Sequence, residues 1–181
     1  KIENKTWLLC EIIKVRLFNF QKKSRAFQVG ERHYDTGNDL FEVMLDPTMS
    51  YSCAYWKGAT SLYEAQITKL DLLCKKLRLE KGMRLLDIGS GWGGLAEHAA
   101  RHYGVRVVGI TVSKEQAELA RERCRGLPVE FRLQDYRDLQ GQFDRIVSVG
   151  MFEHVGFRNY QTYMKKCHSL LRDDGYFVLH T

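Results

Sequence analysis

Apolar and polar positions follow two different periods along the second half of the chain. Short apolar runs rich in β-branched residues are typical of buried strands, and longer stretches with a period near 3.6 are typical of helices. The short runs predict strands at residues 83–88, 105–112, 129–133, 144–149 and 176–180. The longer stretches predict helices at residues 95–103, 113–124 and 159–171. This alternation predicts an α/β fold with a doubly wound, mostly parallel sheet.

The first 80 residues carry a different pattern. Residues 7–20 and 61–79 have broad apolar faces that predict helices, and turn signals flank a short helix at residues 40–45. We therefore divide the chain into an N-terminal segment and connector, a helical cap and the sheet, at residues 1–30, 31–80 and 81–181. Five strands are fewer than a complete sheet of this type has, so we expect the C-terminal part of the sheet to be missing from this chain.

Composition is that of a globular protein and narrows the classes of function. No apolar run of 18 or more residues predicts a membrane-spanning helix. The net charge of +6 is concentrated in residues 1–32, which hold eight Lys and Arg against three Asp and Glu. No nucleic-acid recognition motif accompanies this basic segment, so we expect no nucleic-acid partner. Five cysteines without a C-x-x-C pair favour a reduced, cytoplasmic protein and give no metal site.

A glycine-rich loop joins the first predicted strand to the next helix and reads Asp87-Ile88-Gly89-Ser90-Gly91-Trp92-Gly93-Gly94. Glycines permit a tight turn and a close approach of the backbone to a ligand. The spacing also fits a dinucleotide loop, but the acidic residue expected about 20 residues later is absent at Gly109-Ile110-Thr111. The pattern D-x-G-x-G-x-G, which starts at Asp87, is instead that of class I methyltransferases, which bind S-adenosylmethionine.

Polar residues at the ends of later strands extend this candidate site. Thr111 and Gln116 stand where the second strand ends, in place of the missing acid. Asp135 and Tyr136 follow the third strand and could contact an adenine by hydrogen bonding and stacking, although Asp135 could equally cap a turn.

The candidate catalytic residues come from segments that the topology places at the carboxyl edge of the predicted sheet. The carboxyl ends of parallel strands meet at one edge of the sheet, and the first and fourth strands are neighbours there. Glu153 and His154 follow the fourth strand, and His180 ends the fifth. Both histidines could serve in the site or only in local packing. Cys53, upstream of the sheet, could cover the site or simply fill space.

Several segments together resemble one family of enzymes. They are His33-Tyr34-Asp35, residues 37–41, Leu45-Asp46-Pro47, Tyr51-Ser52-Cys53-Ala54-Tyr55-Trp56, residues 86–94 and Phe152-Glu153-His154-Val155-Gly156. In this order they resemble the bacterial cyclopropane-fatty-acid-phospholipid synthases, relatives of the mycolic acid cyclopropane synthases. The resemblance runs from about Arg25 to Thr181. Members of this family are about twice as long, and their N-terminal lipid-binding region would be represented here only by residues 1–30.

The resemblance implies a reaction on lipid. A methyl group passes from S-adenosylmethionine to a cis double bond of a phospholipid acyl chain, a proton is lost and a cyclopropane ring closes. The intermediate carbocation needs a dry aromatic pocket, for which the resemblance offers Tyr34, Tyr55, Trp56 and His154. The base that takes the proton is implied to be a bound bicarbonate, with Cys53, Glu153 and His180 among its ligands. A further ligand of the family, a tyrosine, would lie beyond residue 181.

The resemblance also implies residues and partners around the cofactor. For S-adenosylmethionine it adds Tyr51, Ser52, Gly93 and Ser113 to the residues named above. The implied substrate is an unsaturated phospholipid, met by a cytoplasmic protein attached peripherally to the inner face of the membrane, and the full-length protein could be a homodimer. A methyltransferase that acts on another apolar substrate, an inactive module that only binds the cofactor and, more remotely, an NAD-dependent oxidoreductase remain open.

Overall fold

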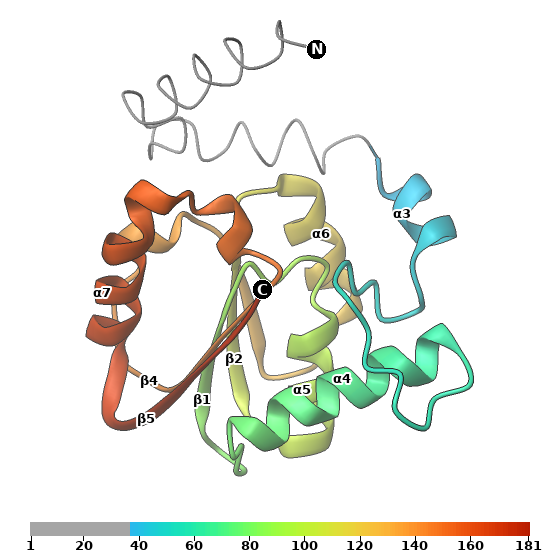
Figure 1. Ribbon diagram of the computed structural model, residues 1–181, viewed down its shortest axis with the longest axis horizontal. Coiled ribbons are helices and arrows are strands. Elements are labelled where there is room, and N and C mark those ends of the chain that lie inside the picture. Colours follow the sequence, from blue (N-terminus) through green and yellow to red (C-terminus); the bar gives the residue numbers. More distant parts are fainter. Residues whose placement is uncertain (1–36) are drawn as a thin grey trace, which may run out of the picture.

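The computed structural model describes residues 37–181 (Figure 1). The predicted helix at 7–20, the segment 1–30 and Tyr34 lie outside this range. One sheet of five parallel strands runs in the order β3-β2-β1-β4-β5, with helices on both faces. The elements are α3 (Asn38–Met44), α4 (Leu62–Lys76), β1 (Arg84–Ile88), α5 (Gly94–Tyr103), β2 (Arg106–Thr111), α6 (Lys114–Arg123), β3 (Val129–Leu133), η2 (Tyr136–Asp138), β4 (Phe143–Val149), η3 (Phe152–His154), η4 (Phe157–Asn159), α7 (Tyr160–Leu170) and β5 (Leu171–His180). The predicted α/β fold with a doubly wound sheet is confirmed.

Local signals set where several helices begin and end. The hydroxyl of Ser61 accepts a hydrogen bond from the Glu64 amide at the start of α4. Ser113 does the same for the Gln116 amide at the start of α6. Each side chain satisfies one of the amides that a helix leaves without a partner in its first turn. Gly104 ends α5 in the left-handed conformation, with φ at 64°, as its position after the helix predicts.

Alternate residues of the strands pack into two separate hydrophobic cores, one on each face of the sheet. Leu85, Val107 and Val147 point to one face and pack with α4, α5 and α6. Leu86, Ile146 and their neighbours point to the other face and pack with α7. Figure 1 shows α7 on one side of the sheet and α5 and α6 on the other. Because both faces are covered, every strand can be apolar on both sides, which explains the continuous apolar runs in the sequence.

The strand order opens a crevice at the carboxyl edge of the sheet. β1 pairs with β4, as predicted, while the chain leaves β1 toward α5 and leaves β4 toward α7. The connections therefore diverge to opposite faces, and a gap remains between them at the strand ends. The Gly150 amide donates to the His180 carbonyl at 3.0 Å, so the end of β5 lies at this edge too. Figure 1 shows the C-terminus beside the loops that follow β1 and β4.

Two boundaries differ by three residues or more from those the sequence predicts. The helix expected at 61–79 ends at Lys76, because Arg78 takes a left-handed φ of 49° and turns the chain toward β1. The last strand begins at Leu171 rather than at 176, directly after α7, and its pairing with β4 is irregular around Arg145. Charged residues at 172–174 hide the start of this strand in the sequence, since they interrupt its apolar pattern.

A small third cluster attaches α3 to the rest of the protein. Phe41 is the buried residue of α3 and packs against Trp92, with 4.7 Å between ring centroids, and against Met49. The Trp92 indole nitrogen donates to Asn38 Oδ1 at 2.7 Å. This contact fixes α3 to the glycine-rich loop that precedes α5.

Phe41→Ala should release α3 without unfolding the sheet. Removal of a buried phenylalanine costs about 3 kcal/mol at the low end of the usual range, and the small size of this cluster favours that end. Amide hydrogen exchange should accelerate in residues 38–44 and stay unchanged in β1 and β4. Val43→Ala is the matched control, because Val43 is 89% exposed on the same helix. Equal acceleration in both variants would contradict the assigned contact.

Candidate functional site

A cavity lies at the carboxyl edge of the sheet, over the ends of β1, β2 and β4. Ten of the residues singled out from the sequence line it: Tyr51, Ser52, Asp87, Gly89, Gly91, Thr111, Gln116, Asp135, Tyr136 and His154. They come from five separate segments, and the strand order brings them together. The lining also includes residues that sequence reasoning did not select, notably Lys69 and Arg137.

The glycine-rich loop forms the floor of the cavity. Gly89 has a φ of 82°, and a Cβ there would lie 2.8 Å from the Met151 side chain. The Gly89 and Ser90 amides both donate to the Ile110 carbonyl at 3.0 Å, which ties the loop to β2. Gly91 has a φ of 52°, and a Cβ there would meet no atom within 4 Å. Gly91 is thus required by its backbone conformation and leaves open space above it.

Gly93 has a different task from the other loop glycines. It does not line the cavity; it starts α5 with a φ of 86°. A Cβ there would lie 2.8 Å from the Phe131 ring and 3.2 Å from Ala120. Gly93 thus lets α5 approach β3 and α6, which is a packing role.

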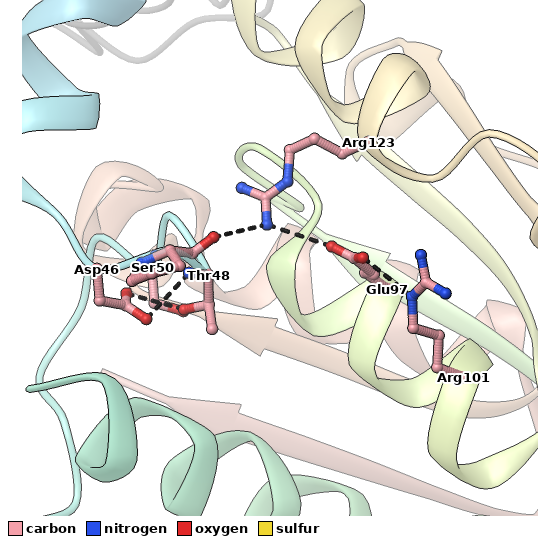
Figure 2. Close-up of polar contacts among 7 residues, drawn as sticks. Asp46, Thr48, Ser50, Glu97, Arg101 and Arg123 are labelled. Carbon is pink, nitrogen blue, oxygen red and sulfur yellow. Dashed lines mark hydrogen bonds and ion pairs between the residues drawn. The ribbon is translucent and has the colours of Figure 1, made fainter.

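A segment at residues 46–52, which we call the strap, forms one wall of the cavity. The Asp46 carboxylate accepts from the Thr48 amide at 3.0 Å, from the Thr48 hydroxyl at 2.9 Å and from the Ser50 amide at 3.4 Å. Asp46 and Thr48 are buried. These bonds fold the strap into a compact turn (Figure 2).

Helices α5 and α6 hold the strap from outside. Figure 2 shows the Arg123 guanidinium between the strap and Glu97. It donates to the Pro47 carbonyl at 3.0 Å and to Glu97 Oε2 at 3.2 Å. At Gly94 a Cβ would lie 2.2 Å from the Thr48 carbonyl oxygen, so only glycine permits the strap to approach the first turn of α5 this closely.

Helix α4 holds the strap from the other side. Gln66 Nε2 donates to the Ser50 carbonyl at 3.2 Å and to the Ser52 carbonyl at 3.0 Å. Lys69 Nζ donates to the Ser52 hydroxyl at 2.9 Å. Sequence reasoning missed both residues. The available signal was a polar pair within the apolar stripe of a helix, since Gln66 and Lys69 are buried beside Ala65, Leu70 and Leu73.

The wall formed by β2 and α6 is organised by a hydrogen-bonded pair. The Thr111 hydroxyl donates to Gln116 Oε1 at 2.8 Å, and both residues are buried. The Ser113 amide donates to the same Thr111 hydroxyl at 3.2 Å. Ser113 itself is fully buried and does not line the cavity, so its visible role is to cap α6.

Asp135 and Tyr136 line the far end of the cavity and also make local contacts. Asp135 Oδ1 and Oδ2 accept from the Arg137 guanidinium, each at 2.8 Å, and Oδ1 caps η2 through the Arg137 amide. The Tyr136 ring is buried against Tyr163, with 5.0 Å between centroids at an interplanar angle of 67°. The turn-cap alternative for Asp135 is therefore observed, alongside its place in the lining.

Two charged groups in the cavity are desolvated. Asp87, at the end of β1, is 2% exposed, and burial raises the pKa of its carboxyl to about 7. Lys69 is 4% exposed, and burial lowers the pKa of its ammonium to about 8 against the opposing attraction of Asp46 and Cys53. Both shifts mark groups whose charged form is destabilised in the protein without a ligand, which is typical of functional sites.

The residues implied as catalytic surround the cavity but do not line it. Cys53 follows the strap and is exposed, Glu153 is exposed on η3, and His180 ends β5. Gly150 links their segments: its amide bonds the His180 carbonyl, and a Cβ at Gly150 would lie 3.5 Å from the Ser52 side chain. Tyr55 and Trp56 are exposed beyond the strap and lie outside the lining.

A buried ring nitrogen stands out in this group. His180 Nδ1 is buried and has no hydrogen-bond partner within residues 37–181. A buried polar atom without a partner is costly unless a ligand or water meets it. In the same range no group of three His, Cys, Asp or Glu residues could hold a metal ion, and no helix is both long and apolar enough to cross a membrane.

Chemically, the arrangement suits a ligand of mixed character. The cavity offers an apolar floor, a buried carboxyl at Asp87, an ammonium at Lys69 and a polar wall at Thr111 and Gln116. A ligand with a flat ring system at one end and both positive and negative groups at the other would match these features.

Comparison with curated proteins finds close relatives. The chain is 61% identical over 170 residues to cyclopropane-fatty-acyl-phospholipid synthase of Escherichia coli K12, which covers 94% of this chain and 44% of that protein. It is 41% identical over 160 residues to the S-adenosylmethionine-dependent methyltransferase UmaA of Mycobacterium tuberculosis, covering 86% of this chain and 56% of that protein. The chain thus spans about half the length of the curated relatives it matches.

Solved structures show the same likeness. The cyclopropane synthase MmaA2 of Mycobacterium tuberculosis superposes with a TM-score of 0.82 at 40% identity, over 86% of this chain and 56% of that one. The mycolic acid cyclopropane synthase CmaA1, solved with SAH and CTAB, gives 0.83 at 41% identity over the same shares. A family model described as mycolic acid cyclopropane synthetase matches residues 21–181. Because this match takes in most of the chain, the protein belongs to the mycolic acid cyclopropane synthetase family.

Proposed function

We propose that this chain forms the cofactor-binding half of an S-adenosylmethionine-dependent enzyme that converts a cis double bond of a phospholipid acyl chain into a cyclopropane ring. The observation that carries the proposal is the cavity at the β1 and β4 ends, in a chain 61% identical to a cyclopropane-fatty-acyl-phospholipid synthase. A relative with 41% identity was solved with SAH, the demethylated product of this cofactor.

The residues of the cavity fit such a cofactor. The open space above Gly91 accepts a ligand close to the backbone. Asp87 offers a buried negative charge to a ligand that carries a sulfonium and an ammonium, and Thr111 and Gln116 offer hydrogen-bonding groups. Arg137 holds the Asp135 carboxylate in place at the far end, where an adenine could be met. When bound, the cofactor supplies an electrophilic methyl group.

The acceptor, an alkene, needs no activation by a base, but the cation that it forms must be protected from water. An alkene attacks the methyl carbon with its π electrons, so no base has to act before transfer. The resulting carbocation must be shielded from water and can be stabilised by aromatic faces. Tyr51, at the mouth of the cavity, and the exposed rings of Tyr55 and Trp56 beyond the strap are the aromatic groups available on this side.

Ring closure then needs a base, because a methyl proton must leave while its bonding electrons close the three-membered ring. We propose that Cys53, Glu153 and His180 hold a bicarbonate, which would supply this base. The unpartnered Nδ1 of His180 and the meeting of all three segments at Gly150 support this placement. The proposed substrate is lipid in a membrane, which the protein would meet from the cytoplasmic side.

Glu153→Gln tests the proposed bicarbonate site. The full-length enzyme that contains this chain should add one CH₂ to cis-unsaturated acyl chains in phospholipid vesicles supplied with methyl-labelled S-adenosylmethionine, as read by mass spectrometry. The variant should lose about 100-fold or more in rate, because the bicarbonate that supplies the base would lose one of its ligands, with unchanged cofactor binding. Glu118→Gln, on the exposed face of α6, is the control. Equal rates for both variants would remove Glu153 from the chemistry.

Asp87→Asn should separate stability from cofactor binding. Burial favours the neutral form of Asp87, so the folded chain loses stability as pH rises from about 4 through about 7 and the carboxyl ionises. The variant avoids this loss and should be more stable than the native chain at pH 8, by up to about 4 kcal/mol in urea unfolding, with little difference at pH 4. It should also bind S-adenosylmethionine more weakly, because the anion is gone.

The exposed acid Asp173 supplies the control for this comparison. Asp173→Asn should change neither the pH dependence of unfolding nor the affinity. If Asp87→Asn destabilised the chain at pH 8, the carboxylate would be a structural group rather than one kept for a ligand.

A further inference from the structure

The charge on Lys69 has no anion beside it. Its side chain enters the apolar stripe of α4 and is 4% exposed, yet it lines the cavity. The Ser52 hydroxyl, at 2.9 Å, is its hydrogen-bond partner among residues 37–181, and it takes part in none of the ion pairs found there. An ammonium has three N–H donors, so two of them have no acceptor within these residues.

The nearby acidic groups do not form an ion pair with the Lys69 ammonium. Asp46 attracts Lys69 but forms no ion pair with it, and its carboxylate already accepts three hydrogen bonds from Thr48 and Ser50. Asp87 lines the same cavity, and its pKa is set by burial alone, which leaves no sign of a cation close to it. An isolated buried cation is costly, and groups perturbed by burial in this way cluster at functional sites.

We propose that Lys69 binds a carboxylate-type anion of the ligand at the strap side of the cavity. This inference rests on the proposed function, because the methionyl end of S-adenosylmethionine carries one such carboxylate. Bicarbonate has the same planar oxyanion and would be the second source. Ser52, held by Lys69 Nζ on one side and by Gln66 through its carbonyl, presents its hydroxyl next to the ammonium, so the two donors together form the anion subsite.

The protonation state of Lys69 supports its assignment to an anion subsite. Burial lowers the pKa of its ammonium to about 8, so most of it is still charged at neutral pH. Lys69 and Asp87 both line the cavity, so it offers one positive and one negative group to the two charges of an amino-acid group. A zwitterionic ligand end is thereby oriented, since reversing it would place like charges together.

The test compares three ligands on the full chain. Lys69→Met removes the charge and keeps an unbranched apolar stem, Lys69→Arg keeps the charge, and Lys76→Met is the control, an exposed lysine on the same helix. The ligands, titrated by calorimetry, are S-adenosylhomocysteine and 5′-methylthioadenosine, which has the same adenosine and sulfur but no amino-acid group. Sodium bicarbonate is the third, read by the shift it causes in the melting temperature.

Lys69→Met should weaken S-adenosylhomocysteine binding roughly 10- to 100-fold, the usual worth of a charge-assisted hydrogen bond, and leave 5′-methylthioadenosine unchanged. Lys69→Arg should keep most of the affinity. If only the bicarbonate shift is lost, the anion is bicarbonate and the subsite stands. The melting temperature of Lys69→Met without ligand should not fall, because an unpaired buried charge has been removed.

Two results would overturn the assignment of Lys69 alone. One is unchanged binding of all three ligands by Lys69→Met. The other is an equal loss for both adenosine compounds together with a lower melting temperature, which would mean that Lys69 only supports the strap. A native chain that binds neither adenosine compound would overturn the proposed function and this inference with it.

Discussion

The attachment of the strap to the carboxyl edge of the sheet is the constraint on which the site depends. The sheet supplies a floor at the ends of β1 and β4, but a floor alone is a shallow surface open to water. Residues 46–52 turn it into a cavity, because Gly94 admits the Thr48 carbonyl and Arg123 holds Pro47 from outside. Gln66 closes the other side. Three helices thus fix one short segment as a wall of the cavity.

The buried charged groups of this cavity reduce the stability of the folded protein when no ligand is bound. Asp87 and Lys69 are both buried, and in each case burial shifts the pKa toward the neutral form. Neither charge is paired within the described part of the chain, so both reduce the stability of the protein without ligand. Groups of this kind are retained where a ligand supplies the opposite charge. A single ligand that carries both an anion and a cation would pair with Lys69 and with Asp87.

Sequence patterns predicted the parts of this protein that are set by local chemistry. The strands and the pairing of β1 with β4 follow from periodicity and topology. The parts they missed depend on contacts between distant residues. Lys69 and Gln66 look like ordinary helix residues until the strap lies beside them, and Gly93 looks like a ligand-binding glycine until Phe131 is placed against it. Spacing in a sequence does not show which loop packs on which helix.

The proposed function requires that the cavity under the strap receives S-adenosylmethionine. Amide hydrogen exchange of the full chain, with and without S-adenosylhomocysteine, tests it most directly because the readout is local. Slower exchange is expected in residues 46–53, 87–94 and 134–137, which line or border the cavity, with little change in residues 164–177 of α7 and β5, which lie outside its lining. Protection of residues 164–177 instead, or none in the strap and the glycine-rich loop, would show that this cavity does not receive the ligand.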